Sequence, residues 1–463
     1  MPELPEVETV KNVLKEIVLN HTIKSIDVIR PETVRSDLKE FKEKLTGATI
    51  TDFSRVGKYI VFHFDRDFYL LSHLRMEGKY FHREEKFRPN HNDLILFHFT
   101  DGTYLSFNDT RRFGTMEIVP TENYLEREPL NKIGPDPFMM KDASRLYENF
   151  KDKNVAIKPC LLDQSVMSGL GNIYVDEVLF ACKIHPETPA KLITRKQYEE
   201  ILYYSRDIMG RAISKGGTTI ISYHPREGIN GEFRFELKVY GQNGGKCVNC
   251  GTPLRKKFVN GRGTTFCPKC QINIGKPYVV GVTGPVGSGK STVAKILEEK
   301  GFIRISADEI VHELYKDKKY QQFLVKLVPN LPLIDGDVDR NFLRKAMIKD
   351  QRLKHQIEEM VHHHVLTKIN NQIHKINPQK KVVVEIPLLF ESGFNDKCNE
   401  IIYVDVNDEV QIKHLEERCS PVNELRQINQ NFNLANKKKA TVVLDNNGTV
   451  ANLNKQINSI FGK

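Results

Sequence analysis

The sequence predicts a multidomain protein in which a β-rich part and a helical part precede a cysteine-rich ribbon and an α/β part. Its 463 residues exceed what one ordinary hydrophobic core accommodates, so two or three domains are expected. The period of the hydrophobic residues changes from strand-like to helical along the chain. Near the C-terminus, apolar strands alternate with helices, which implies a parallel sheet covered on both faces.

We expect the β-rich part over residues 1–125. It contains one early helix, about residues 7–19, and several short segments that are rich in β-branched or aromatic residues and are separated by Gly, Asp and Asn. These segments are residues 22–29, 58–64, 68–74, 94–100 and 103–107.

Helical patterns dominate residues 140–236, where the hydrophobic period becomes 3.6. They occupy residues 143–152, 172–184 and 195–216, and a loop rich in glycine and polar residues follows. Residues 237–273 then form the predicted ribbon. In residues 277–463, strands are expected at 278–284, 381–390 and 401–406, with a helix at 290–301 after the first of them.

Composition and charge restrict the class of protein. The net charge of +10 favours a polyanionic partner, and the basic excess is local: residues 201–276 contain 13 Lys and Arg against 4 Asp and Glu. Four of the eight cysteines are scattered along the chain, which is not typical of a disulfide framework, so we expect a protein of the reducing cytoplasm. The polar N-terminus does not resemble a signal peptide. No apolar run is long enough to span a bilayer, so we expect no membrane partner.

Four cysteines form a C-x2-C-x16-C-x2-C pattern at Cys247, Cys250, Cys267 and Cys270. Thiolates at this spacing can converge on Zn²⁺, and a four-thiolate site leaves no open position for water, so a single structural zinc ion is expected. The alternative is a chance pair of C-x-x-C sequences. Between the two pairs, residues 255–263 read RKKFVNGRG, a basic hairpin suited to a phosphate backbone.

The N-terminal sequence MPELPEVE places a proline directly after the initiator methionine. Removal of the methionine would leave Pro2 as a secondary amine, which is less protonated at neutral pH than a lysine and can attack a sugar aldehyde carbon. Glu3 and Glu6 could move protons beside such a nucleophile. The alternative is an ordinary terminal proline without a catalytic role.

The first part of the chain resembles the formamidopyrimidine-DNA glycosylases. After PELPEVETV, the resemblance continues over about residues 1–273 through GKYI, SHLRMEG, NDTRRFG, IKPCLLDQ, GLGNIYVDEVLF, GGTT and the cysteine ribbon. It implies a β-sandwich, a helix-two-turns-helix domain and a zinc ribbon. It also implies a bifunctional glycosylase and AP lyase that acts on double-stranded DNA containing oxidised purines, chiefly 8-oxoguanine and formamidopyrimidines.

The resemblance also implies roles for individual residues. Pro2 would form a Schiff base at C1′ with Glu3 as the acid, Lys58 would assist β-elimination, and Arg262 would assist δ-elimination. The residues that would contact DNA are Met76, His91, Arg111, Phe113, Lys153 and Asn172. Met76, Arg111 and Phe113 would fill the gap left by an extruded nucleotide.

Two alternatives apply to these assignments. The spacing of Met76 and Phe113 alone favours positions in the core of a sheet. The related endonuclease VIII-like enzymes prefer oxidised pyrimidines, whereas Leu4, the sequence RRFG and the long loop at 217–235 favour the purine branch.

A phosphate-binding loop with the pattern G-x-x-x-x-G-K-S lies between the first C-terminal strand and its helix. Its glycines allow backbone N–H groups to surround phosphate oxygens, Lys290 supplies charge, and the Ser291 hydroxyl can bind Mg²⁺. The predicted ATP-binding residues are Gly284, Pro285, Val286, Gly287, Ser288, Gly289, Lys290, Ser291 and Thr292.

The sequence from this loop onward is similar to dephospho-coenzyme A kinases over about residues 278–450. The resemblance is carried by VTGPVGSGKST, ISADEI, DGDVDR, EIPLLFE and VVLDNNGT. It implies an α/β P-loop kinase with a parallel sheet and a helical lid, about residues 330–375, which transfers phosphate from ATP with Mg²⁺ to the 3′-hydroxyl of dephospho-CoA.

In this second resemblance, Asp308 would be the catalytic base or would orient the hydroxyl. Arg340 would be a charge clamp for the substrate near the lid, and Glu385 would lie near the metal. Asp308 could instead be an ordinary acid at a helix N-terminus, and the histidines at 362–364 are expected to form a polar helix face. The sequence has histidine at His312 and His414, where the family has arginine.

The leading interpretation is therefore a fusion of two enzymes that acts as a monomer. One alternative is an active glycosylase joined to a nucleotide-binding domain without catalytic activity. A second is a protein that binds DNA lesions without lyase activity. A third is an artificially joined reading frame.

Overall fold

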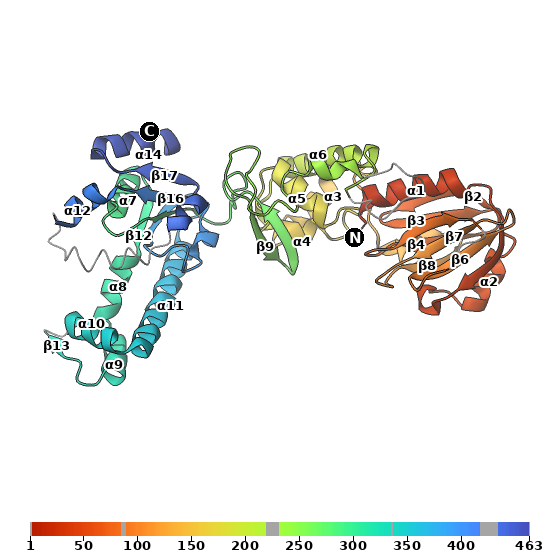
Figure 1. The fold of residues 1–463 in the computed structure, drawn as a ribbon. Coiled ribbons are helices and arrows are strands. Elements are labelled where there is room, and N and C mark those ends of the chain that lie inside the picture. Colours follow the sequence, from red (N-terminus) through yellow and green to blue (C-terminus); the bar gives the residue numbers. More distant parts are fainter. Residues whose placement is uncertain (1, 85–88, 219–230, 335–336, 417–433, 463) are drawn as a thin grey trace. The chain divides into compact units, whose positions relative to one another are not determined.

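A computed structural model describes residues 2–84, 89–218, 231–334, 337–416 and 434–462, and it describes Arg340 only by its backbone (Figure 1). Residue contacts divide the chain into two compact units. The first contains residues 1–249 and 254–271, and the second contains residues 272–463 together with the short turn 250–253.

The first unit begins with two antiparallel sheets of four strands each, with the orders β1-β6-β7-β5 and β2-β3-β4-β8. The strands are β1 (Ile23–Val28), β2 (Ile50–Val56), β3 (Tyr59–Phe64), β4 (Phe68–His73), β5 (Lys79–Arg83), β6 (Asp93–Phe99), β7 (Tyr104–Asn108) and β8 (Thr115–Pro120). Helices α1 (Leu4–Val18) and α2 (Leu38–Leu45) share one hydrophobic core with both sheets. This arrangement confirms the expected sandwich.

The first unit continues with helices that have a separate core, which includes Leu4 of α1. The helices are α3 (Ser144–Phe150), α4 (Ile157–Leu161), α5 (Asn172–Ala181) and α6 (Arg195–Ser214). Short 3-10 helices lie between the longer elements: η1 (Pro31–Thr33), η2 (Tyr124–Glu126), η3 (Leu130–Lys132), η4 (Ala190–Leu192) and η5 (Glu232–Glu236). The ribbon hairpin follows, with β9 (Arg255–Val259) antiparallel to β10 (Arg262–Phe266).

The second unit contains a parallel sheet of five strands in the order β12-β15-β11-β16-β17, as the alternation of strands and helices predicts. Its strands are β11 (Tyr278–Thr283), β12 (Ile303–Ser306), β15 (Lys381–Glu385), β16 (Glu400–Asp405) and β17 (Val442–Asp445). Helices α7 (Lys290–Glu299) and α14 (Val450–Phe461) contribute to one core beside the sheet, and α8 (Ala307–Lys316) and α11 (Gln351–Lys375) contribute to another. Helix α12 (Asp408–Glu416) and the 3-10 helices η6 (Phe394–Lys397) and η7 (Leu434–Lys439) complete this unit.

A smaller helical cluster is attached to this sheet through α8 and α11, which lead away from it in Figure 1. It contains α9 (Lys318–Leu327), α10 (Arg340–Lys349) and the strand pair β13 (Leu333–Ile334) and β14 (Asp337–Val338). The cluster has a core of its own, formed by residues such as Leu324, Leu343 and Ile357. The predicted lid, about residues 330–375, covers α10, α11 and the strand pair of this cluster but not α9.

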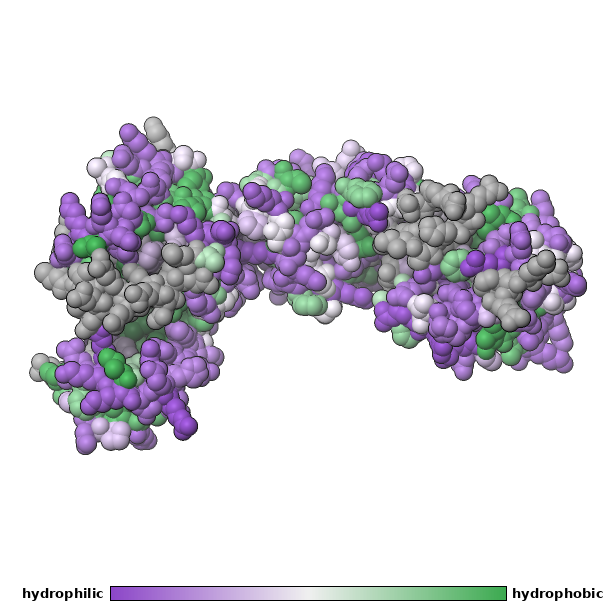
Figure 2. Space-filling model, viewed as in Figure 1, coloured by the Kyte–Doolittle hydropathy of each residue, from purple (hydrophilic) through white to green (hydrophobic). Residues whose placement is uncertain are grey.

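The surface of both units is mostly hydrophilic in the view of Figure 2. Among the described helices, none has the length and hydropathy required to cross a lipid bilayer.

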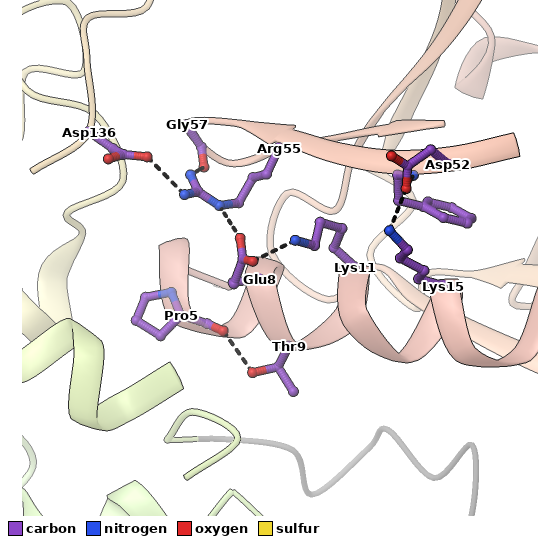
Figure 3. Close-up of polar contacts among 10 residues, drawn as sticks. Pro5, Glu8, Thr9, Lys11, Lys15, Asp52, Arg55, Gly57 and Asp136 are labelled. Carbon is purple, nitrogen blue, oxygen red and sulfur yellow. Dashed lines mark hydrogen bonds and ion pairs between the residues drawn. The ribbon is translucent and has the colours of Figure 1, made fainter. Parts of the chain in front are cut away.

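An ion-pair network joins α1, β2 and the segment before α3 (Figure 3). The Arg55 guanidinium donates through Nε to Glu8 at 2.7 Å and through a terminal nitrogen to Asp136 at 2.8 Å. Its other terminal nitrogen donates to the carbonyl of Gly57 at 2.8 Å. The Arg55 side chain is only 10% exposed, whereas the nearby pair of Lys15 and Asp52 is about half exposed. The network therefore fixes the turn that leads to Lys58 against α1.

We predict that Arg55→Met lowers the local free energy of unfolding around α1 and β2 by about 3 kcal/mol, because Glu8 and Asp136 lose their shared partner in a poorly solvated position. Hydrogen–deuterium exchange of peptides from α1 and β2 measures this change. The matched variant Lys15→Met removes an exposed pair of the same elements and should cost less than about 1 kcal/mol. Equal exchange rates in the two variants would contradict the structural role of Arg55.

Candidate functional site

A cleft of about 400 Å³ in the first unit brings together residues from distant parts of the sequence. Five of the predicted site residues line it: Glu3, Lys58, Met76, Asn172 and Arg262. Pro2 is half-buried and directly precedes Glu3, whereas Met1 lies outside the described residues. The cleft therefore collects an acid, a lysine and an arginine beside the start of the chain.

The start of α1 is held tightly against the segment that precedes α5. The Leu4 N–H donates to the carbonyl of Gly169 at 3.1 Å. Gly169 has φ +95°, and a Cβ there would lie 2.5 Å from the Leu4 side chain. A Cβ at Gly171 would lie 2.3 Å from the Glu3 carboxyl carbon. Only glycine allows this close approach, which sets the position of Pro2 and Glu3.

The Glu3 carboxylate caps the N-terminus of α5. Its oxygens accept hydrogen bonds from the backbone N–H groups of Ile173 at 2.8 Å and Tyr174 at 3.3 Å. Glu3 is 2% exposed, and this burial raises its pKa to about 7 although Lys58 lies nearby. Glu3 can therefore be protonated or ionised near neutral pH, as a residue that gives and takes protons requires.

Glu6 connects α1 to the end of α6. It accepts hydrogen bonds from the Tyr174 hydroxyl at 2.7 Å and from the Thr218 N–H at 2.9 Å, and its second oxygen accepts from the Glu3 N–H at 3.0 Å. Glu6 is absent from the cleft lining, so its contacts serve to hold the α1 terminus. Thr218 is the last described residue before 219–230, so most of the loop at 217–235 that favours the purine branch lies outside the described residues.

Lys58 points its amine at the backbone of the same segment. Its Nζ donates to the carbonyl of Leu170 at 2.7 Å, and the residue is only 7% exposed. Burial lowers the pKa of the Lys58 amine, which increases its neutral fraction. Such an amine can accept a proton from a group bound in the cleft.

Arg262 of the ribbon hairpin lines this cleft, and contacts between the hairpin and the helical domain hold it there. Asn172 donates through Nδ2 to the carbonyl of Gly263 at 2.9 Å. Lys158 and Asp176 form a fully buried ion pair at 2.7 Å, and Lys158 also donates to the Thr264 hydroxyl at 2.8 Å. These contacts fix β10, the strand that begins at Arg262, against the helical domain.

Three of the predicted DNA-contacting residues are exposed rather than buried in a sheet. Met76 is 39% exposed and Phe113 is 54% exposed, so the sheet-core alternative is wrong for both. The guanidinium of Arg111 lies 5.3 Å from the centroid of the Phe113 ring. The buried Asp109 carboxylate accepts hydrogen bonds from the N–H groups of Arg111 and Phe113, both at 2.9 Å, which holds this loop in shape.

His91 and Lys153 are also exposed, and neither lines the cleft. The ammonium of Lys153 lies 5.1 Å from the Phe150 ring centroid, and the His91 carbonyl accepts from Arg112 at 3.4 Å. Their side chains can therefore meet a ligand only outside the cleft.

The four ribbon cysteines lie together, as their spacing predicts. Their Sγ atoms are all within 4.8 Å of one another, and those of Cys247 and Cys270 are 3.9 Å apart. Thiolates bound to Zn²⁺ at about 2.3 Å have tetrahedral edges of about 3.8 Å, so the arrangement fits this ion. The Cys270 N–H also donates to the Cys267 sulfur at 3.3 Å, a bond that stabilises a metal-bound thiolate. The cluster therefore supports a structural zinc site.

The glycine-rich loop of the second unit has the backbone that phosphate binding needs. Gly287 and Gly289 have φ of +83° and +94°, which are unfavourable for other residues. Lys290 starts α7 and donates to the carbonyls of Gly284 at 3.1 Å and Pro285 at 2.9 Å. Asn446 supports the loop by donating to the Ser288 carbonyl at 2.8 Å. The loop thus places Lys290 and Ser291 at the C-terminal edge of β11.

Carboxylates gather beside this loop. Ser291 Oγ donates to Glu385 at 2.5 Å, and Arg304 lies 3.4 Å from the same carboxylate. Asp308 is the second residue of α8, so it does occupy a helix N-terminus. Burial and then the nearby Glu385 raise the pKa of Asp308. A hydroxyl and a carboxylate are suitable ligands for Mg²⁺, so this edge fits the metal that the sequence implies.

Three other features of the second unit were singled out from the sequence: the histidines at 362–364, His414 and Arg340. His362 lies with Asp308 at a cavity of about 170 Å³, and all three histidines at 362–364 are exposed, as a polar helix face requires. His414 lies 3.0 Å through Nδ1 from the Gly287 carbonyl of the phosphate loop. Arg340 begins α10, and its side chain lies outside the described residues.

Several residues that build these sites were not singled out by the sequence interpretation. Arg55, Gln164, Lys158 and Asp176 support the first unit's cleft, and Arg304 and Asn446 support the phosphate loop. The only signal for most of them is membership in a stretch such as IKPCLLDQ or DNNGT, which does not indicate which residue they contact.

Comparison with known proteins assigns both units. Residues 1–116 match the formamidopyrimidine-DNA glycosylase N-terminal domain, and residues 133–223 match the H2TH domain of the same enzymes. Residues 244–272 match a zinc finger found in FPG and IleRS, and residues 278–452 match dephospho-CoA kinase.

Individual relatives agree with this assignment. The formamidopyrimidine-DNA glycosylase of Ligilactobacillus salivarius is 45% identical over 276 residues, which cover 59% of this chain and 99% of that protein. The enzyme of Oceanobacillus iheyensis is 42% identical over 59% of this chain and 98% of its own length.

Solved structures of Lactococcus lactis Fpg are similar as well. One is a complex of the wild-type protein with DNA containing N7-benzyl-Fapy-dG, and another is a complex with DNA containing an abasic site. Each is 40% identical with a TM-score of 0.55, and each covers 58% of this chain and 99% of the solved chain. The chain therefore belongs to the formamidopyrimidine-DNA glycosylase family in its first 272 residues, and it carries a dephospho-CoA kinase domain in residues 278–452.

Proposed function

We propose that the first unit excises oxidised purines such as 8-oxoguanine and formamidopyrimidine from double-stranded DNA through the amine of Pro2, and that the second unit phosphorylates dephospho-CoA. The observation that carries the first assignment is the cleft in which Glu3, Lys58 and Arg262 meet beside the start of the chain. Four domain matches in sequence order support the pairing of the two enzymes.

In the excision step, the Pro2 nitrogen attacks C1′ of the damaged nucleotide after Met1 has been removed. The bond between C1′ and the base breaks, and the base leaves with the bonding electrons and takes up a proton. Glu3 then gives its proton to the sugar ring oxygen as the ring opens, which yields an iminium between Pro2 and C1′. The pKa of about 7 that burial gives Glu3 provides a protonated acid for this step.

Strand cleavage follows from the iminium. It acidifies the C2′ protons, and a base removes one of them while the 3′-phosphate leaves. Lys58 is our candidate for assisting this β-elimination because burial lowers the pKa of its amine. Arg262 lies across the same cleft, where its charge can stabilise the 5′-phosphate that leaves in the δ-elimination.

We assign DNA contacts to the exposed residues around the cleft. Met76 and Phe113 are large apolar side chains at the surface, and Arg111 lies beside the Phe113 ring, so the three can enter a duplex from which a nucleotide has been extruded. His91, Lys153 and the Asn172 side chain are our candidates for phosphate contacts. The backbone N–H groups of Ile173 and Tyr174 are engaged by Glu3, so phosphate binding at this helix start would depend on Asn172.

In the second unit, the loop at 284–292 would surround the phosphates of ATP, with Lys290 near the β- and γ-phosphates. Ser291 and Glu385 would hold Mg²⁺, which neutralises phosphate charge when it is bound. Asp308 would take the proton of the attacking 3′-hydroxyl of dephospho-CoA, and Arg340 would bind substrate phosphate. We further propose that the protein acts as a monomer in the cytoplasm.

Borohydride trapping tests the proposal for the first unit. Incubation with duplex DNA that contains 8-oxoguanine should produce a covalent adduct, and Pro2→Gly should reduce adduct formation by about a hundredfold or more because the secondary amine is lost. The Lys15→Met variant is the matched control, since it alters an exposed lysine that pairs with Asp52 and does not line the cleft. Absence of an adduct with the unaltered protein would instead support a lesion-binding protein without lyase activity.

The protonation state of Glu3 predicts the pH dependence of Schiff base formation. Because burial places the pKa of Glu3 near 7, the acid form is abundant below pH 7 and is depleted as the pH rises above it. Single-turnover formation of the borohydride-trapped adduct should therefore fall about tenfold per pH unit well above 7. In Glu3→Gln, adduct formation should be slow and should lose this descending limb. A wild-type rate that is flat between pH 6 and 9 would exclude Glu3 as the proton donor.

Phosphate transfer from ATP to dephospho-CoA tests the second unit. Asp308→Asn should lower kcat by about a hundredfold or more while the affinity for ATP changes little, because Asp308 would act on the hydroxyl rather than on the nucleotide. Lys290→Met should weaken ATP binding itself. If the unaltered protein binds ATP but forms no CoA, the second unit is a nucleotide-binding domain without this activity.

A further inference from the structure

The segment of residues 162–171 supports both the chain start and Lys58, and the Gln164 side chain connects its two ends. Gln164 donates through Nε2 to the carbonyls of Leu162 at 3.0 Å and Leu170 at 2.9 Å. Its Oε1 accepts from the Gly169 N–H at 3.0 Å. One amide thus holds three backbone groups of the segment together.

Two of these contacts lead directly to the site. The Leu170 carbonyl that Gln164 binds also accepts from the Lys58 Nζ at 2.7 Å, so one oxygen is shared by two donors. Gly169 uses its N–H toward Gln164 and its carbonyl toward the Leu4 N–H. Gln164 is therefore connected to the Lys58 amine through the backbone of Leu170, and to the start of α1 through the backbone of Gly169.

We propose that Gln164 is a positioning residue that holds the Lys58 amine for strand cleavage by fixing the Leu170 carbonyl. The proposal rests on the role in β-elimination that we propose for Lys58. Gln164 also lines the same cleft as Lys58, and it is half-buried. It touches no reacting atom in this role, because it acts through the backbone acceptor that it shares with the lysine.

The surroundings of the lysine show what a charge at position 164 would change. The charged and titratable groups that face Lys58 are Glu3 before α1, Glu6 in α1, His73 at the end of β4 and Arg262 at the start of β10. Gln164 is a neutral neighbour that shares the Leu170 carbonyl with the Lys58 amine. A carboxylate there could not donate to the Leu170 carbonyl, and its negative charge would stabilise the protonated lysine and raise its pKa.

Two substitutions separate these effects. Gln164→Met keeps the length of the side chain and removes its three hydrogen bonds. It should slow β-elimination by about tenfold or more at every pH, which is the scale of one or two hydrogen bonds. Gln164→Glu should also move the rising limb of the pH–rate profile toward alkaline pH, because the neutral lysine then forms only at higher pH.

The matched control is Arg145→Met. Arg145 braces the same segment from outside the cleft, by donating to the carbonyls of Val166 at 2.9 Å and Ser165 at 2.9 Å. It contacts neither Leu170 nor Lys58 in these bonds. General loosening of the segment should affect this variant and the Gln164 variants alike, whereas a positioning role should affect only the latter.

The experiment uses the full-length protein in excess over duplex DNA with a preformed abasic site. Each reaction is divided in two, so that borohydride trapping measures Schiff base formation and denaturing electrophoresis measures strand cleavage over a range of pH. In both Gln164 variants, we expect the rate of strand cleavage to fall more, relative to the wild type, than the rate of Schiff base formation. The pH–rate profile should shift toward alkaline pH only in Gln164→Glu. Arg145→Met should resemble the wild type in both rates.

Unchanged cleavage and an unchanged pH profile in both Gln164 variants would overturn the inference, as would equal losses in Arg145→Met. Equal losses of trapping and cleavage in Gln164→Met would also overturn it, because the residue would then support the chain start rather than Lys58. The Lys58→Met variant tests the proposed function separately: wild-type cleavage in that variant would remove the role of Lys58, whatever the Gln164 variants do.

Discussion

The close contact between the start of the chain and the segment before α5 is the constraint on which the first unit's site depends. Glu3 is buried against the N-terminus of α5, and it can approach this closely because Gly171 has no side chain. Because the Leu4 N–H is bonded to Gly169, the residue before Glu3 has little freedom to move. The same contact excludes water from Glu3 and raises its pKa. One packing interaction thus both places the amine of Pro2 and prepares the acid beside it.

The chemistry that we propose uses two amines whose environments differ. Lys58 is almost completely buried and shares the carbonyl of Leu170 with Gln164. Pro2 is half-buried, and once Met1 is removed its nitrogen becomes a terminal secondary amine, whose pKa is intrinsically lower than that of a lysine. In the second unit, strand β11 ends beside a glycine-rich loop, and the loop leads into the helix that begins with the buried Lys290. A loop of this kind before a helix suits phosphate binding. Each unit has its own hydrophobic cores, and we find no chemistry that the two share.

The parts of these sites that the sequence predicts are the parts encoded by local spacing. The four cysteines and the phosphate loop depend on residues a few positions apart, and their geometry agrees with the prediction. Many strands and helices were predictable from hydrophobic period, whereas β2, β5, β8, β12 and β17 were not singled out because each is short or contains polar residues. Supporting residues such as Arg55 and Gln164 could not be identified, because their roles depend on tertiary contacts. Arg55 binds Asp136, which lies 81 positions away. Gln164 binds the nearby Leu170, but that carbonyl matters only because it also contacts Lys58, which lies 112 positions from Leu170. The exposure of Met76 and Phe113 was likewise unpredictable from spacing, which favours the sheet core.

The central claim is that the chain's second residue, rather than the buried lysine beside it, forms the covalent bond to DNA. Peptide mapping by mass spectrometry of the reduced protein–DNA adduct tests this claim most directly. The account predicts that the deoxyribose remnant is attached to an N-terminal peptide that begins at Pro2, with Lys58 unmodified. Attachment to Lys58, or to any peptide while Met1 is still present, would contradict it.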